Sequence, residues 1–112
     1  MTAADLHRWV DAYNWDDGLA PMWPIVDSPQ TEYATALLIY WRLGGPWLTS
    51  KLGDVNTEAK SLQDHVRTRL LSGLYSVGSC EFDPNEELTK IELFKLRKEG
   101  FPEVLLGSLG HR

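Results

Sequence analysis

The segment 14–18, Asn-Trp-Asp-Asp-Gly, gathers side chains that could bind an ion or a partner. Counted as a calcium loop from Asn14, it places oxygen donors at the first, third and fourth positions. Its glycine falls at the fifth position, where a calcium loop needs it at the sixth. The twelfth residue is Ile25, where a bidentate glutamate is required. The pattern therefore does not predict a calcium site.

Two other interpretations of this acidic segment stay open. In the first, its Asn and Asp side chains accept hydrogen bonds from nearby amides, and the segment only ends the preceding helix. In the second, Trp15, Asp16 and Asp17 form an exposed recognition loop, because loops commonly carry binding residues. These three residues, together with Glu32, are the candidate protein-binding residues of the chain.

The three histidines, His7, His65 and His111, are spread along the chain. His7 and Asp11 are four residues apart, a spacing at which two side chains on one helix face can share a metal ion. A protein metal site also needs a third and a fourth ligand, and no second ligand pair stands at a suitable spacing. We therefore predict neither a metal nor a cofactor.

Nucleophilic catalysis would require Cys80 or a serine beside a base and an orienting acid. The sequence contains no nucleophile elbow and no glycine-rich phosphate loop. A carboxylate pair could be drawn from any two of sixteen acids, so that pattern has no specificity. The prediction is that the protein is not an enzyme and that Cys80 fills a small apolar space.

Cysteine content and hydropathy favour a cytoplasmic protein. A single cysteine forms no internal disulfide and supplies no cysteine-pair zinc site, which indicates a reducing compartment. No stretch of eighteen apolar residues occurs, so no membrane-spanning segment is predicted. Residues 1–13 carry Asp5 and Asp11 without the basic start and apolar core of a signal peptide.

Negative charge is concentrated in the N-terminal part of the chain. Residues 1–65 contain nine acids and four bases, whereas residues 66–112 contain seven of each sign, which leaves the whole net charge of −5 in the first part. An acidic surface repels phosphate backbones, so nucleic-acid binding is disfavoured and a basic protein partner is favoured. The alternative is that this charge only keeps a small domain soluble.

Apolar residues recur at helical spacing between turns rich in Gly, Pro, Asn and Asp. The predicted helices cover about residues 2–13, 22–26, 30–43, 57–71 and 86–99, with a final turn at 102–106. Segment 74–82 has strand character interrupted by Gly78, so a small two-stranded element there is an open alternative. The prediction is one compact all-α domain of about five helices over residues 1–112.

The pattern also predicts which faces are buried. Segment 30–43 is apolar on nearly every side, which indicates a helix at the centre of the fold. The predicted core faces of the other helices are Leu6, Trp9, Val10 and Tyr13; Ala59, Leu62, Val66 and Leu70; and Leu88, Ile91 and Phe94. The side of segment 57–71 expected to face water comprises Lys60, Gln63, Asp64, Arg67 and Arg69. Trp41 joins Trp9 in the predicted core, while Trp15, Trp23 and Trp47 either seal the ends of the bundle or anchor a partner.

Several segments together resemble an uncharacterised bacterial family, domain of unknown function 4274. They are Tyr-Asn-Trp-Asp-Asp-Gly at 13–18, Pro29, Thr-Ala-Leu-Leu-Ile-Tyr-Trp at 35–41, Gly-Leu-Tyr at 73–75 and Phe-Asp-Pro-Asn at 82–85. The resemblance covers roughly residues 6–87. Members often have a Cys-Asp pair and a glycine before the Thr-Ala-Leu helix, where this chain has Thr31, Glu32 and Ala34. A function that depended on that cysteine is therefore not expected here, whereas Glu32 keeps the negative charge.

Small, acidic members of this family resemble the immunity proteins of bacterial polymorphic toxin systems, which stay in the cytoplasm and bind a cognate toxin. The resemblance implies a protein-binding domain that neutralises a toxin, and a basic toxin domain would suit the acidic charge. Two other hypotheses stay open: a small self-associating structural or regulatory module, and, less favoured, an enzyme of unknown chemistry. The sequence does not identify the toxin or the face that binds it.

Overall fold

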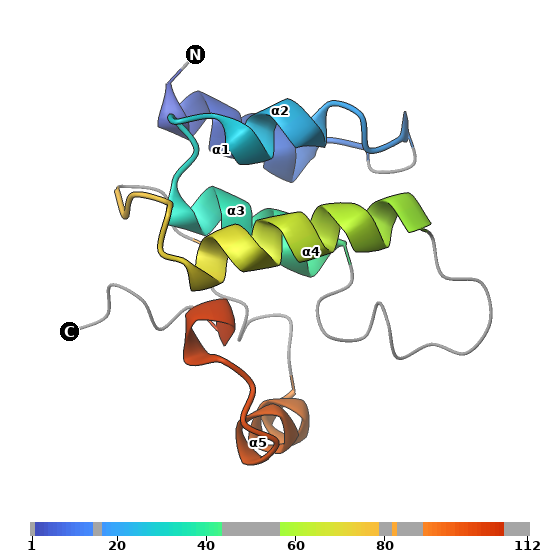
Figure 1. Ribbon diagram of the computed structural model, residues 1–112, viewed down its shortest axis with the longest axis vertical. Helices are drawn as coiled ribbons and strands as arrows, with labels where there is room; N and C mark the ends of the chain where they lie inside the picture. The colour runs from blue at the N-terminus through green and yellow to red at the C-terminus, as the bar shows by residue number, and fades with distance from the viewer. Residues whose placement is uncertain (1, 15–16, 44–56, 79–81, 83–88, 107–112) are drawn as a thin grey trace.

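The protein is described by a computed structural model over residues 2–14, 17–43, 57–78, 82 and 89–106. These residues form an all-α domain (Figure 1). Its elements are α1 (Ala3–Ala12), α2 (Met22–Asp27), α3 (Tyr33–Arg42), α4 (Thr57–Leu71), α5 (Lys90–Lys98) and a 3-10 turn, η4 (Glu103–Leu106). The predicted all-α fold is thus confirmed, with each helix in or beside its predicted range.

Capping boxes set the start of two helices. The Thr2 hydroxyl accepts a hydrogen bond from the Asp5 amide at 3.1 Å, and the Asp5 carboxylate accepts one from the Thr2 amide at 3.1 Å. Thr89 and Glu92 form the same reciprocal pair at the start of α5. The structure therefore begins α5 at Lys90, later than the predicted start near residue 86; residues 83–88 lie outside the described ranges.

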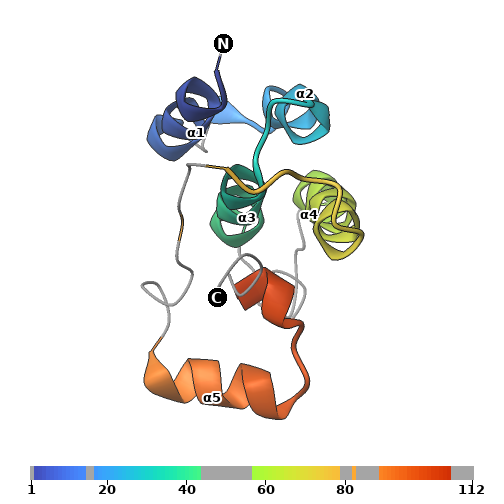
Figure 2. The same ribbon diagram turned by 90° about the vertical axis from the view of Figure 1, so that its left-hand side faces the viewer.

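Helix α3 is the centre of the fold, as its all-round apolar pattern predicts. Every residue from Tyr33 to Trp41 is buried. Helices α1 and α2 lie on one side of α3, α4 lies beside it, and η4 and α5 lie on the other side (Figure 2). The large apolar side chains of α3 therefore meet neighbours in several directions, and burying them supplies the main driving force for folding.

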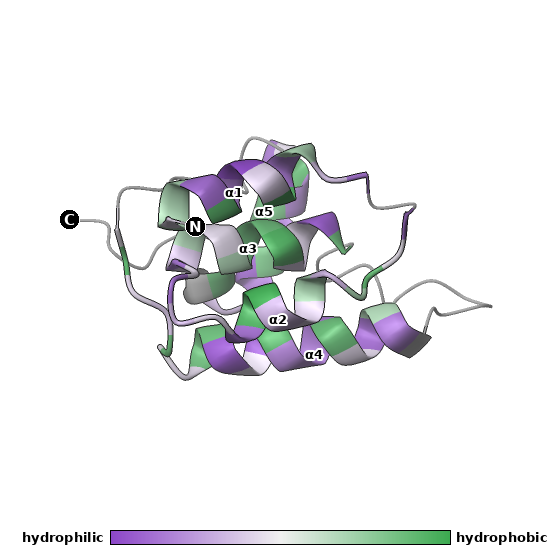
Figure 3. Ribbon diagram, turned by 90° about the horizontal axis from the view of Figure 1, so that it is seen from above, coloured by the Kyte–Doolittle hydropathy of each residue, from purple (hydrophilic) through white to green (hydrophobic). Residues whose placement is uncertain are grey.

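Helix α4 turns its predicted stripe to the core: Ala59, Leu62, Val66 and Leu70 are all buried. Seen from above in Figure 3, α4 shows alternating hydrophobic and hydrophilic residues along its length, as expected of a helix with one wet face. The prediction for Gln63 is wrong, because this residue is buried with the stripe. At about 3.6 residues per turn, Gln63 lies at the edge of the buried stripe.

The predicted core face of α5 is wrong. Ile91 and Phe94 are 68% and 65% exposed, whereas Leu96 is buried and Leu93 packs against the core. Leu93 and Leu96 lie opposite Ile91 on the helix, since residues two and five positions apart point away from each other. Helical spacing selected the face of Ile91 and Phe94, whereas the docking of the helix buries the face of Leu93 and Leu96. Leu88 lies outside the described ranges.

The tryptophans divide differently from the prediction. Trp41 is buried, as expected, and its indole N–H donates a hydrogen bond to the Leu105 carbonyl oxygen at 2.8 Å. Trp9, also predicted to be in the core, is 38% exposed. Trp23 packs partly buried against the core, which suits a ring that seals the bundle. Trp15 and Trp47 lie outside the described ranges.

The described part of the segment after α4 pairs with Glu32, the residue before α3. Among the described residues, the pairing found there is an isolated parallel bridge between Glu32 and Ser76, in which the Tyr33 amide donates to the Ser76 carbonyl oxygen at 2.8 Å. Residues 79–81 are outside the described ranges. The radius of gyration, 13.6 Å, is close to the value of about 13 Å expected for a folded chain of this length. Across the described ranges, every helix is too short or too polar to cross a bilayer.

Candidate functional site

The turn that follows α1 is held by backbone and side-chain hydrogen bonds. The Asp17 amide donates to the Asn14 carbonyl oxygen at 3.0 Å, and the Tyr13 hydroxyl donates to the Gly18 carbonyl oxygen at 2.7 Å. Gly18 has a φ of 105°, a backbone conformation that residues other than glycine rarely adopt. The turn is therefore fixed at both ends. Asp17 is exposed on it, while Trp15 and Asp16 lie outside the described ranges.

Aromatic side chains connect this turn to the outer face of α1. The Trp9 ring stacks on the Tyr13 ring with centroids 4.9 Å apart and planes inclined by 24°. Trp9 is the more exposed of the two rings, and Tyr13 is partly buried against the core. One tyrosine thus supports an exposed indole with its ring and the acidic turn with its hydroxyl.

Most carboxylates near this surface have basic partners within the chain. Asp5 pairs with Arg8 at 2.5 Å, and Asp11 pairs with Arg42 at 2.7 Å. Hydrogen bonds from the Thr2 amide and hydroxyl hold the pKa of Asp5 below its ordinary value. Asp17, by contrast, has no ion pair within the described part of the chain. Its charge is therefore available to a partner.

The structure does not bring Glu32 to the acidic turn. Glu32 is the residue before α3 and is bridged to Ser76, and its carboxylate fills the space that a Cβ at Gly78 would occupy. In Figure 1 the N-terminal end of α3 lies at the opposite end of the molecule from the turn that follows α1. The predicted set therefore separates into two places, with Asp17 at one and Glu32 at the other.

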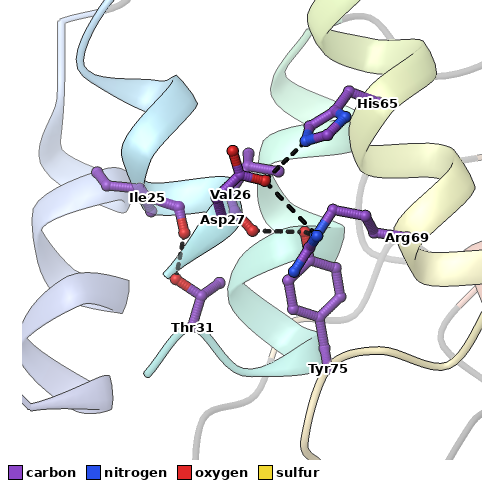
Figure 4. A network of polar contacts seen from close by, with 7 residues as sticks. All are labelled: Ile25, Val26, Asp27, Thr31, His65, Arg69 and Tyr75. Atoms are coloured by element: carbon purple, nitrogen blue, oxygen red, sulfur yellow. Dashed lines mark hydrogen bonds and ion pairs between the residues drawn. The ribbon is translucent and has the colours of Figure 1, made fainter. Parts of the chain in front are cut away.

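A polar network that the sequence did not reveal joins α2, α4 and the segment after α4 (Figure 4). The Asp27 carboxylate contacts His65 Nε2 at 2.7 Å and Arg69 Nη1 at 3.6 Å. Arg69 Nε donates to the Tyr75 hydroxyl at 3.2 Å, and that hydroxyl donates to the Val26 carbonyl oxygen at 2.8 Å. These contacts give the Val26 carbonyl oxygen at the end of α2 a hydrogen-bond donor and link Asp27 to α4.

Aromatic contacts reinforce the network. The Trp23 ring lies 5.6 Å from the His65 ring, and the Arg69 guanidinium stands over the Tyr75 ring at 5.3 Å. Burial raises the pKa of Tyr75, so its hydroxyl keeps its proton and remains a donor. Within the described ranges, no serine, threonine or cysteine side chain is hydrogen-bonded to His65. The cluster therefore links α2 to α4 and to the segment after α4 through polar contacts.

The sequence indicates only the part of this network that lies on α4. His65 and Arg69 are four residues apart, which places them on one face of α4. Their carboxylate partner, Asp27, lies 38 residues before His65 and ends a different helix. Spacing along one helix cannot reveal such a pairing, because it depends on how α2 packs against α4.

The residues considered for metal binding have other contacts. His7 Nδ1 lies 2.8 Å from the hydroxyl of buried Thr35, whereas Asp11 faces Arg42. In the described part of the chain, no three His, Cys, Asp or Glu side chains gather closely enough to hold a metal ion. The helical spacing of His7 and Asp11 thus serves two separate contacts between α1 and α3.

Comparison with known proteins identifies one protein-family model, described as "Domain of unknown function (DUF4274)", which matches residues 2–74. The match takes in α1 to α4, the acidic turn and Glu32, and it ends before the Phe-Asp-Pro-Asn segment at 82–85. Neither a curated protein nor a solved structure matches the chain.

Proposed function

We propose that this chain, which belongs to the family of the domain of unknown function DUF4274, is a protein-binding domain that neutralises a cognate bacterial toxin as a cytoplasmic immunity protein. Its partner in this proposal is the basic domain of a toxin encoded beside it. The binding surface consists of the exposed face of α1 around Trp9 and the acidic turn 13–18.

The observation that carries the proposal is the linkage of Trp9 to the acidic turn through Tyr13. The indole is exposed, stacked and attached to a helix, so little side-chain freedom is lost when a partner covers it. Tryptophan is strongly enriched among the residues that dominate binding energy. The Tyr13 hydroxyl donates to the Gly18 carbonyl oxygen and so holds the turn on which Asp17 is exposed. An aromatic anchor and a fixed charge thus occur together.

Charge supports a basic partner over a neutral one. Residues 1–32 contain six acids and only Arg8 as a base, so the net charge of −5 is accounted for by α1, α2 and the turns beside them. Such a field accelerates association with a basic surface and favours it over acidic competitors. Asp16 and Asp17 are adjacent in the turn and contribute two of the six charges.

The test of this proposal is a binding measurement with an inactivated form of the toxin domain encoded by the neighbouring gene. Trp9→Ala should weaken binding by a factor of about 30 or more, because truncation of a central aromatic anchor costs about 2 kcal/mol or more. The matched control is Leu74→Ala, which removes another large exposed apolar side chain far from α1 in sequence. Calorimetric titration measures both affinities.

The measurement discriminates between three results. A large loss with Trp9→Ala and no loss with Leu74→Ala supports the surface. Equal affinity for wild type and Trp9→Ala would move the interface away from α1. Absence of any binding by the wild-type protein would overturn the toxin partner itself.

A further inference from the structure

Helix α5 carries a surface that the proposed toxin site does not use. Ile91 and Phe94 are more than half exposed, and Lys95 and Lys98 are exposed beside them. These four residues follow the i, i+3, i+4, i+7 spacing of one helix face. We call this set the α5 face. It is apolar towards the start of the helix and basic towards its end.

The α5 face differs in charge from the N-terminal part of the molecule. Helix α5 contains four bases, Lys90, Lys95, Arg97 and Lys98, against Glu92. The Glu92 carboxylate accepts a hydrogen bond from the Thr89 amide at 2.9 Å, so it is held at the helix start, away from Lys95 and Lys98. An acidic surface with an aromatic group is the complement of this face, and the α1 end of the protein is such a surface.

We propose that the α5 face binds the α1 surface, around Trp9 and Asp17, of a second copy of this chain. Helices α1 and α5 lie at opposite ends of the molecule in both Figure 1 and Figure 2. The α1 surface of a chain therefore cannot cover the α5 face of the same chain, and the contact between copies is head-to-tail. Phe94 and Ile91 meet the Trp9–Tyr13 pair, while Lys95 and Lys98 face Asp17.

The size of the α5 face sets the strength of this contact. Stable complexes bury about 1,200–2,000 Å² in total, and one face of a helix as short as α5 gives less. The association is therefore weak and reversible, and it depends on protein concentration and on salt. Because each copy offers both surfaces, chains of copies lengthen as concentration rises. A toxin that covers the α1 surface would dissociate these head-to-tail assemblies.

The experiment measures the mass of the purified protein without any partner, so its result is independent of whether a toxin binds. Sedimentation velocity from about 10 µM to about 1 mM spans the affinity range of weak contacts. The weight-average mass should rise above the monomer mass of 12.7 kDa at low salt and fall back in about 0.5 M NaCl. Ile91→Ser with Phe94→Ser should keep the protein monomeric throughout.

Matched variants distinguish association through the α5 face from non-specific hydrophobic association and from loss of folding. Leu74→Ser removes an exposed apolar side chain elsewhere and should leave association as in the wild type. Lys95→Glu with Lys98→Glu should be monomeric alone, and so should Asp17→Lys. A mixture of these two charge variants should associate again, because the unchanged α5 face of the Asp17→Lys variant meets the unchanged turn of the other variant, and the two reversed surfaces are also complementary. Each variant is used after circular dichroism shows a wild-type thermal midpoint.

Several outcomes would overturn the proposal. A wild-type protein that stays monomeric at about 1 mM and low salt has no such contact. Association that survives in the Ile91→Ser, Phe94→Ser variant uses another surface. Failure of the mixed charge variants to associate excludes the Asp17 turn as the complement. If the wild type remains monomeric but binds vesicles of anionic lipid through Phe94, then the occupant of the α5 face is a lipid surface and not a second copy.

Discussion

The indole N–H of Trp41 donates a hydrogen bond to the carbonyl oxygen of Leu105, 64 residues later in the chain. The contact fastens η4 to the central helix, and Leu105 and Leu106 are both buried beside it. The family match ends at residue 74, yet the core of this protein is completed by residues beyond it. The C-terminal part is thus a structural element of the domain.

The first prediction concerns this hydrogen bond. Trp41→Phe keeps an aromatic ring but leaves the Leu105 carbonyl oxygen buried without its donor, which should lower the free energy of unfolding by about 1–3 kcal/mol. Urea unfolding followed by circular dichroism measures the change. Trp9→Phe is the matched control, because Trp9 is exposed, and it should change stability by less than about 0.5 kcal/mol. Equal stability of the Trp41→Phe variant and the wild type would mean that the bond contributes nothing.

The second prediction concerns the centre of α3. Leu38 is 1% exposed, so Leu38→Ala removes buried methyl groups and leaves a cavity. The free energy of unfolding should fall by about 2–5 kcal/mol. Leu71→Ala, on the exposed side of α4, makes the same chemical change without a cavity and should cost far less. An unfolding midpoint unchanged by Leu38→Ala would contradict the central position of α3.

The third prediction concerns alkaline pH. Burial raises the pKa of Tyr40 to about 12 from its ordinary value of 10.0. Between these values the unfolded chain releases the phenol proton while the folded protein retains it, so the free energy of unfolding falls as pH rises. This group alone accounts for a slope of up to about 1.4 kcal/mol per pH unit in that window.

Tyr40→Phe isolates this contribution. Urea unfolding of wild type and variant is compared at about pH 8, where neither state ionises the phenol, and then at about pH 10 to 11. As pH rises, the free energy of unfolding of the wild type should fall relative to that of Tyr40→Phe. A constant difference across this range would show that Tyr40 ionises equally in both states.

The fourth prediction concerns the polar network between α2 and α4. Tyr75→Phe deprives the buried Val26 carbonyl oxygen of its donor and Arg69 of an acceptor. The free energy of unfolding should fall by about 1–3 kcal/mol, again measured by urea unfolding. Asp64→Asn, which removes an exposed carboxylate paired with Lys60, is the control and should have little effect. A loss no larger than the control's would show that the network does not stabilise the fold.

The parts of the fold that local signals determine were predictable from the sequence. Thr2 and Asp5 mark a helix start by their spacing, and the run from Tyr33 to Trp41 indicates a helix buried on all sides. Glycines at positive φ, Gly73 and Gly100, follow α4 and α5 closely. Each of these signals acts within a few residues, so no knowledge of the packing is needed.

The features that depend on packing were not predictable. α5 has an apolar pair on each of two sides, Ile91 with Phe94 and Leu93 with Leu96, and only the docking of the helix decides which is buried. Trp9 is at core spacing on α1 but lies at the edge of the buried face, where its ring reaches solvent and stacks on Tyr13.

The candidate site was predictable in part for the same reason. The acidic turn stood out because its residues are adjacent in sequence, and the structure describes Asp17 there as exposed. The grouping of Glu32 with Asp17 rested on shared charge, and charge does not specify position. The support that Tyr13 gives to both Trp9 and Gly18 required the three-dimensional arrangement.

The measurement that tests the central claim most directly is the association rate with the basic partner as a function of salt. Asp16→Lys with Asp17→Lys should slow association and flatten its salt dependence, because these charges steer the encounter over long range. Glu58→Lys, a charge reversal at an exposed residue of α4, is the control, compared per charge changed. Stability should change by less than about 0.5 kcal/mol in each variant. An association rate and salt dependence equal to those of the wild type in the folded double variant would contradict binding through the acidic turn.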